Sequence, residues 1–373
     1  MKKTGLKLIA LLMAALLASA FIIFAFASEG FEEDAYTNIV TFSDCQNFGP
    51  VAYNNFGRIL KVMRDDGMPE PDSLIVGGDY SLLLADYSTP GVIQLREHYV
   101  NVYPGADADD IICAQGNHDQ RVAAFYPSGM YDMGTYCLYL INEDNYPWRQ
   151  SQSKKAEGIV RATADDIKAC LDSMIAEGDT RPVILVTHVP LHYTTRTSGG
   201  DNKYASYVFD VLNEAGSELD IIFLFGHNHS GDYDDYIGGS VNFMAPGDTV
   251  YIPDPENTGI GGYTEETLSF TYTNCGYVGY NNNNATETSV NVSSLGAIRF
   301  FEDKFVFLKY TSDGLFREDE VTRINPADES DMGAEVSTAG MTRNNTVIWR
   351  IEKLIFEPLI KLMIRLFTML GVV

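Results

Sequence analysis

Short apolar runs alternate with helical stretches as far as about residue 230, and this alternation constrains the fold more than any other feature of the chain. The runs have the length and composition of buried strands. They are residues 38–43, 73–76, 111–114, 182–187 and 220–225. The stretches between them have apolar residues at helical spacing, and they are residues 55–66, 92–99, 164–176 and 204–215. This order predicts an α/β fold, in which a ligand site lies beyond the carboxyl ends of the strands.

Polar cassettes follow the predicted strands directly, and five of the six histidines lie in three of them. The histidine cassettes are Gly-Asn-His-Asp at 116–119, Thr-His-Val-Pro-Leu-His at 187–192 and Gly-His-Asn-His at 226–229. Two acidic turns come earlier, Ser-Asp-Cys-Gln at 43–46 and Gly-Gly-Asp-Tyr at 77–80. Imidazole nitrogens together with carboxylate and amide oxygens are the ligands that a pair of divalent metal ions requires. The sequence therefore predicts a metal site.

The candidate ligands divide between two ions. Two cations about 4 Å apart can share a bridging carboxylate, grip a phosphoryl group and lower the pKa of a water molecule. A carboxylate such as Asp79 can form this bridge. One ion would also need Asn117, His188 and His227. The other ion would take Asp44, Gln46 and His229.

Each candidate ligand also has a plain structural interpretation when it is considered alone. Asp79 or Asn117 after a strand is usually a turn residue that bonds the backbone. His188 at the end of an apolar strand is usually a buried core residue. These interpretations would have to hold at every position of the ordered set at once, so the complete set favours metal ligation.

The ordered motifs Asp-x-Gln, Gly-Asp, Gly-Asn-His-Asp, a strand-ending His and Gly-His-x-His resemble those of the calcineurin-like metallophosphoesterases, over about residues 38–310. The resemblance implies an α/β fold of two mixed β-sheets that pack face to face and are flanked by helices. It implies two divalent ions (Mn²⁺, Fe²⁺, Zn²⁺ or Mg²⁺) and hydrolysis of phosphate esters by a metal-bridging hydroxide. By the same resemblance, Asp79 is the bridging ligand, and His118 is the acid that stabilises the phosphoryl transition state or protonates the leaving group.

The chain departs from the usual family pattern at Gln46, where the family commonly has His. An amide oxygen is a weaker ligand than imidazole, and it favours harder ions such as Mn²⁺ or Mg²⁺ over Zn²⁺. This departure leaves open a second interpretation, a surface-displayed, non-catalytic binding module with a degenerate metal site. His118 favours the enzyme, because it is not a ligand in this scheme and a purely structural site has no need of it.

The net charge of −25 limits the partners of the chain. Such a surface repels phosphate backbones, so we expect no broad nucleic-acid binding and favour a small phosphorylated substrate. Candidate residues for contact with the substrate phosphate are Arg121, His192 and Arg196. Arg196 could do so through a bidentate pair of hydrogen bonds.

The first 27 residues have the pattern of an export signal. Three lysines precede an apolar run from residue 8 to 24, and Ala-Phe-Ala at 25–27 has the small-x-small form of a cleavage site. The apolar run is also long enough to be an uncleaved anchor. Both interpretations predict an extracytoplasmic protein, either secreted or associated with the cell surface.

Helical periodicity stops after residue 230, and the predicted strands there are 241–245, 267–273, 297–301 and 304–310. We expect a metallophosphoesterase domain at 36–312, a polar linker at 313–345 and an amphipathic helix at 346–373. In that helix the charged residues recur every three or four positions, which leaves a wide apolar face. Such a face predicts a helix at the membrane surface, and the alternative is a helix that packs on its own domain.

Overall fold

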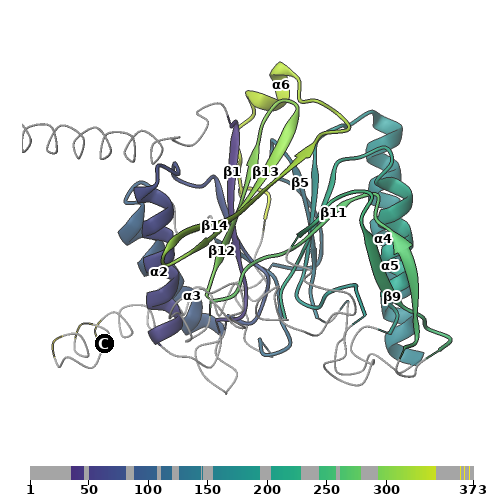
Figure 1. Cartoon of the computed structure of the whole chain (residues 1–373), viewed down its shortest axis with the longest axis horizontal. Coiled ribbons are helices and arrows are strands. Elements are labelled where there is room, and N and C mark those ends of the chain that lie inside the picture. The colour runs from purple at the N-terminus through teal and green to yellow at the C-terminus, as the bar shows by residue number, and fades with distance from the viewer. Residues whose placement is uncertain are drawn as a thin grey trace, which may run out of the picture.

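The computed structural model describes residues 35–45, 50–80, 88–106, 111–119, 126–143, 145, 154–193, 203–227, 243–257, 261–278 and 293–341, together with 362, 365 and 369. The helices described are α2 (Pro50–Asp65), α3 (Ser88–Val102), α4 (Lys154–Glu177), α5 (Ala205–Ala215) and α6 (Glu329–Met332). Figure 1 shows two β-sheets side by side in the centre, with α2 and α3 on one flank and α4 and α5 on the other. The predicted fold class is confirmed.

The first six-stranded sheet has the order β14-β13-β12-β1-β2-β3. Its strands are β1 (Thr37–Phe42), β2 (Ser73–Val76), β3 (Ile111–Cys113), β12 (Leu295–Phe300), β13 (Lys304–Thr311) and β14 (Gly314–Thr322). Strands β1, β2 and β3 are parallel to one another, while β12, β13 and β14 add as antiparallel neighbours. The carboxyl ends of the three parallel strands therefore lie at one edge of the sheet.

The second six-stranded sheet has the order β4-β5-β6-β7-β11-β8. Its strands are β4 (Gly129–Asp132), β5 (Cys137–Ile141), β6 (Val183–Thr187), β7 (Ile221–Phe225), β8 (Phe243–Met244) and β11 (Thr271–Asn274). The four strands from β5 to β11 in this order are parallel. A separate antiparallel pair, β9 (Thr249–Pro253) and β10 (Tyr263–Thr267), contacts α5.

The structure differs from the sequence-based boundaries at several places. The predicted strand 267–273 is instead the end of β10 and the start of β11. Strands β4 and β5 were not predicted. The predicted linker begins too early, because residues 314–322 form β14 and pair with β13. That strand lies at the edge of its sheet and alternates exposed with half-buried residues, so its polar sequence has the composition of a linker.

Apolar side chains fill the space between the sheets. Ile39, Ile75 and Ile112 of the first sheet join the same buried cluster as Ile184 and Leu224 of the second. Neighbouring residues on these strands face the helices instead. The strands are buried on both faces, which explains why each one is a continuous apolar run in the sequence.

No helix in the described part of the chain is both long enough and apolar enough to cross a membrane. Of the predicted C-terminal helix only residues 362, 365 and 369 are described, and all three are helical and exposed. The predicted signal segment lies outside the described residues.

The first testable prediction concerns the core between the sheets. Phe300 is fully buried and its ring contacts those of Tyr36, Tyr136 and Phe305 at centroid distances of 6.1, 5.9 and 5.0 Å. Phe300→Ala should lower the free energy of unfolding by about 3–5 kcal/mol, because it leaves a cavity in a close-packed layer. Urea denaturation measures this. The exposed Leu315 on β14 is the control, and Leu315→Ala should change stability by less than about 0.5 kcal/mol. Equal losses would contradict the assignment of the core.

Candidate metal centre

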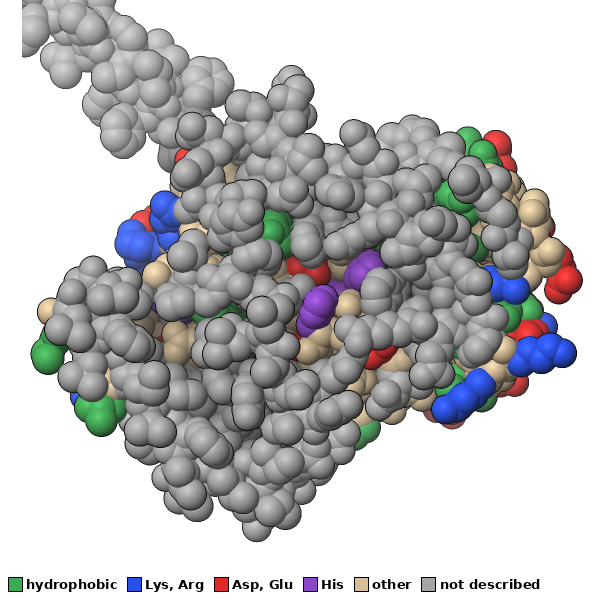
Figure 2. All heavy atoms as spheres, turned by 90° about the horizontal axis from the view of Figure 1, so that it is seen from below, with side chains coloured by type: hydrophobic (Ala, Val, Ile, Leu, Met, Phe, Trp, Pro, Cys, Tyr) green, Lys and Arg blue, Asp and Glu red, His purple; other side chains and the backbone are tan. Residues whose placement is uncertain are grey.

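Five of the seven predicted ligands lie in the described part of the chain, and they meet where the carboxyl ends of the parallel strands of both sheets come together. Asp44 and Asp79 follow β1 and β2 of the first sheet, while His188 and His227 follow β6 and β7 of the second. Asn117 follows β3. Figure 2 shows the molecule of Figure 1 from below, and histidine and acidic side chains lie together near the centre of that face.

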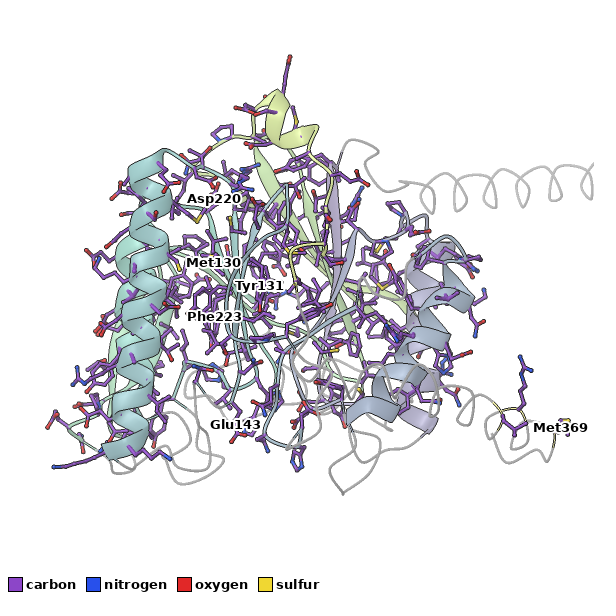
Figure 3. All side chains as sticks on the ribbon, turned by 180° about the vertical axis from the view of Figure 1, so that it is seen from behind. Met130, Tyr131, Glu143, Asp220, Phe223 and Met369 are labelled. Atoms are coloured by element: carbon purple, nitrogen blue, oxygen red, sulfur yellow. The ribbon has the colours of Figure 1, made fainter. Side chains whose placement is uncertain are left out.

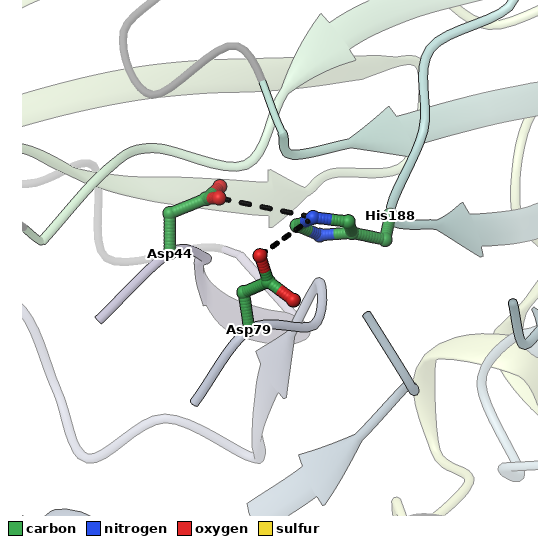
Figure 4. Close-up of side chains that lie close together, drawn as sticks. All are labelled: Asp44, Asp79 and His188. Atoms are coloured by element: carbon green, nitrogen blue, oxygen red, sulfur yellow. Dashed lines mark ion pairs between the residues drawn. The ribbon is translucent and has the colours of Figure 1, made fainter. Parts of the chain in front are cut away.

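Three buried donor groups form the centre of the site. One donor atom from each of Asp44, Asp79 and His188 can be chosen so that all lie within 4.8 Å of one another. His188 Nε2 is 3.1 Å from Asp79 Oδ2 and 3.8 Å from Asp44 Oδ1, and Figure 4 shows the imidazole facing both carboxylates. Two carboxylates and an imidazole at this spacing fit a divalent cation.

The imidazole of His188 is oriented by the main chain. Its Nδ1 lies 2.8 Å from the carbonyl oxygen of Gly77, so Nδ1–H donates to that carbonyl. Because this bond fixes the tautomer, Nε2 keeps its lone pair for a metal ion. His227 Nδ1 lies 3.1 Å from Asn117 Oδ1 and 3.3 Å from His188 Nε2, so these further donor atoms converge on the same region.

The backbone is strained at three of the predicted ligands. Asp44, Asp79 and His227 have φ values of 57°, 55° and 66°, and no other described non-glycine residue has a positive φ. Residues other than glycine rarely adopt this region, and where they do the strain is usually held by the surroundings of a functional site. The strain therefore marks the same residues that the sequence motifs single out.

Two glycines allow the loops to approach one another. A Cβ atom at Gly116 would lie 2.2 Å from Asp79 Oδ1, and one at Gly78 would lie 2.8 Å from both the backbone of Gly116 and His188 Nδ1. Gly78 also has φ 91°. Any larger residue at either position would push the β2 and β3 loops apart and separate the ligands.

Charge is concentrated in this buried space. Burial opposes ionisation of Asp79, but the neighbouring His188 more than offsets it and holds the pKa of Asp79 below its usual range. In the same way, burial would lower the pKa of His188, while the carboxylates of Asp79 and Asp44 raise it. The same two carboxylates that raise the pKa of His188 would also stabilise a bound cation.

His118 has a different environment from the ligands. Its side chain is 41% exposed, and its Nε2 lies 4.0 Å from Asp79 Oδ2. The main chain is anchored, because the N–H of His118 donates to Asp79 Oδ1 at 2.8 Å. The imidazole thus lies beside the ligand cluster with one side open to solvent.

The remaining site predictions have varied outcomes. Gln46, His229, Arg121 and Arg196 lie outside the described residues, so their roles stay predictions. His192 is fully buried, and its Nδ1 bonds the hydroxyl of Tyr272 at 2.8 Å. This bond places His192 in the core around β11, and its contact with substrate also stays a prediction.

Sequence reasoning assigned no role to Asp119, the last residue of the Gly-Asn-His-Asp cassette. Its side chain is fully buried and accepts hydrogen bonds from the backbone N–H groups of Asp79, Tyr80 and Gly116. Burial first, and then the negative charge of Asp79, raises the pKa of Asp119. Its position within the cassette was the available signal.

Comparisons with known proteins agree with this geometry. A family profile described as calcineurin-like phosphoesterase matches residues 37–231, more than half of the chain. The chain therefore belongs to the calcineurin-like phosphoesterase family. No curated protein sequence matches it.

Among solved structures, similar chains include a dimetal phosphatase from Danio rerio, with 11% identity, a TM-score of 0.46 and coverage of 78% of this chain and 100% of that one. GAP50, the anchor in the inner membrane complex of Plasmodium, has 13% identity, a TM-score of 0.48 and coverage of 79% and 92%. Vps29 from Entamoeba histolytica has 12% identity, a TM-score of 0.31 and coverage of 77% and 99%. At these values the likeness carries no argument about function.

The second prediction follows from the burial of His192, which lowers the pKa of its imidazole to about 3. An unfolded histidine has a pKa of about 6.5, so below that pH the unfolded chain binds a proton that the folded chain does not. The free energy of unfolding should therefore decrease as the pH falls from about 6.5 towards 3. The contribution of His192 to this decrease is at most about 1.4 kcal/mol per pH unit.

His192→Gln removes the titrating group and keeps a polar partner for Tyr272. The stability advantage of the natural chain over this variant should shrink between pH 7 and 4, as measured by urea denaturation at each pH. Other titrating groups are common to both proteins and cancel in the difference. Parallel stability profiles would show that His192 is not buried as a neutral imidazole.

Proposed function

We propose that this chain is an exported, metal-dependent phosphoesterase that hydrolyses phosphate ester bonds in small substrates. The observation that carries the proposal is the buried cluster of Asp44, Asp79 and His188 at the carboxyl ends of both sheets, with the accessible imidazole of His118 beside it. The membership of the chain in the calcineurin-like phosphoesterase family supports the same chemistry.

The donor set suits hard or borderline divalent ions. Asp79 would bridge two ions, and Asn117, His188 and His227 would complete the ligands of one. Asp44, Gln46 and His229 would complete those of the other. Ions bound there would neutralise phosphoryl charge and lower the pKa of the attacking water. The neutral amide of Gln46 favours Mn²⁺ or Mg²⁺ at its position.

His118 is the residue we assign to proton transfer. Its main-chain bond to Asp79 fixes the base of the side chain, while the exposed imidazole can reach a substrate held at the cluster. A proton at Nε2 would be donated to the leaving oxygen or would stabilise charge on the phosphoryl group.

The competing function is a surface-displayed binding module with a degenerate metal site. Gln46 is the feature that favours it, because a weaker ligand could leave the second ion position unfilled. The two functions differ at His118, which a binding module does not need.

We also propose where the protein acts. The signal pattern of residues 1–27 favours export, and the segment 346–373 favours association with a membrane surface. Leu362 and Met369 in that segment are 54% and 78% exposed, and Figure 3 shows Met369 far from the two sheets. Apolar side chains exposed in this way are stabilised by contact with the apolar part of a lipid layer.

The third prediction separates ligation from proton transfer. The purified chain should bind two divalent ions, as measured by plasma mass spectrometry after incubation with Mn²⁺. Asp79→Ala should lose bound metal and all turnover, because both ions share this carboxylate. His118→Ala should keep its metal and lose about 10²–10⁴-fold in kcat on nitrophenyl phosphate esters. Full turnover in Asp79→Ala would refute the metal centre, and full turnover in His118→Ala would refute the role of its imidazole.

The fourth prediction concerns the membrane surface. A chain that begins at residue 28 should float with vesicles that contain anionic lipid, while the same chain without residues 346–373 should stay in the aqueous fraction. Leu362→Ser with Met369→Ser should weaken flotation, because both substitutions remove exposed apolar surface. Leu315→Ser, which changes an exposed apolar residue on β14, is the control and should float normally. Equal flotation with and without the segment would contradict its role.

A further inference from the structure

We propose that Asp119 is a positioning residue that holds Asp79 in the conformation required for metal binding. The inference rests on the proposed function, because it concerns the carboxylate that we assign as the bridge between the ions. Asp119 contacts neither substrate nor metal in this scheme. It acts through the backbone of its neighbour.

The carboxylate of Asp119 receives three main-chain hydrogen bonds from two different loops. Asp119 Oδ2 accepts from the N–H of Asp79 at 2.6 Å and from the N–H of Gly116 at 2.9 Å. Asp119 Oδ1 accepts from the N–H of Tyr80 at 3.1 Å. One buried side chain thus joins the turn after β2 to the turn after β3.

The bond pattern is reciprocal. While Asp119 receives the backbone N–H of Asp79, the side chain of Asp79 receives the backbone N–H of His118 at 2.8 Å. Each loop supplies a carboxylate to the other, and Gly116 lies between them without a Cβ that would separate them. The two loops therefore form one unit, which carries the proposed bridging ligand and the proposed acid.

The held conformation is a strained one. Asp79 has φ 55°, and a residue with a side chain lowers its conformational energy when it leaves this region. Hydrogen bonds from the N–H groups of Asp79 and Tyr80 to Asp119 offset the strain on both sides of the α-carbon. In this conformation Asp79 Oδ2 lies 3.1 Å from His188 Nε2, so relaxation of the backbone would move a ligand oxygen out of the cluster.

An amide cannot replace this carboxylate. Asn at position 119 would present one oxygen and one NH₂ group to three N–H donors, so at least one donor would face another donor. Asp119→Asn is therefore a small change in shape that disrupts the hydrogen bonds holding the two loops together.

Asp220 provides a matched control. It is also a buried carboxylate that accepts main-chain hydrogen bonds, from the N–H groups of Ile324 at 2.8 Å and Asn325 at 3.2 Å. Asp220 precedes β7, whereas the site lies beyond the carboxyl end of that strand. Figure 3 shows Asp220 at the opposite end of the sheets from Glu143, which follows the carboxyl end of β5. Asp220→Asn should destabilise the protein without reaching the metal centre.

The experiment measures the affinity for Co²⁺ by isothermal titration calorimetry in the full chain and in both variants, with thermal unfolding of each metal-free protein. Asp119→Asn should weaken the tighter Co²⁺ site by at least about 10-fold, the size of effect expected when the support of a ligand is removed. Asp220→Asn should bind within about twofold of the natural chain, whatever its loss of thermal stability.

The outcomes are distinct. Affinity in Asp119→Asn within twofold of the natural chain, or equal weakening in both variants, would overturn the positioning role and leave the metal site standing. Absence of Co²⁺ binding in the natural chain would overturn the metal site and this inference with it. If Asp119→Asn does not fold, hydrogen exchange is measured on the natural metal-free chain instead. Slow exchange at the amides of Asp79, Tyr80 and Gly116 would support the positioning role of Asp119, and rapid exchange would overturn it.

Discussion

The meeting of two sets of parallel strand ends is the constraint on which the rest of the site depends. Main-chain bonds fix this meeting, because the N–H of Ser43 donates to Gly276 at 3.0 Å and the N–H of Val278 donates to Ser43 at 3.2 Å. These bonds join the end of β1 in one sheet to the residues after β11 in the other. Asp44 follows Ser43 directly, so its position relative to His188 is set by backbone and not by side-chain packing alone. Carboxylates from one sheet can then face imidazoles from the other across a fixed distance.

Local strain and buried charge are two costs that the site must offset together. The left-handed backbone of Asp44, Asp79 and His227 aims their donor groups inward, and an ordinary turn would not bring them to the same point. Closely spaced buried carboxylates repel one another unless a cation or proton lies between them. Main-chain hydrogen bonds to Asp44 and Asp119 offset the backbone strain, and the imidazole of His188 offsets the repulsion between the carboxylates. A divalent ion would offset the repulsion between the carboxylates more completely than a proton, since it carries more charge at the same place.

The sequence predicted the parts of the structure whose residues are constrained on every side. Strands β1, β2 and β3 are buried on both faces, so their apolar runs had one interpretation. Strand β14 was missed because an exposed edge strand has no apolar pattern to distinguish it from a linker. His188 and His192 belong to the same cassette, yet only His188 lies at the cluster, because Tyr272 holds the side chain of His192 in the core. Nothing in the spacing of two histidines distinguishes these environments. Asp119 was overlooked for a related reason, since its partners are backbone N–H groups, and only its position in the Gly-Asn-His-Asp cassette indicated a role.

Charge explains how so acidic a protein could attract an anionic substrate. The net charge of −25 repels phosphate at long range, and screening by salt confines that repulsion to about 8 Å at physiological ionic strength. Within that distance the local charge decides. Two bound divalent ions would carry more positive charge than Asp44, Asp79 and Asp119 together carry negative charge, so the site would be positive when it is loaded. Affinity for a phosphorylated substrate should therefore depend on metal occupancy. If Gln46 is the ligand that we propose, its neutral amide would strengthen this dependence, because it adds no negative charge that would cancel part of the charge of the second ion.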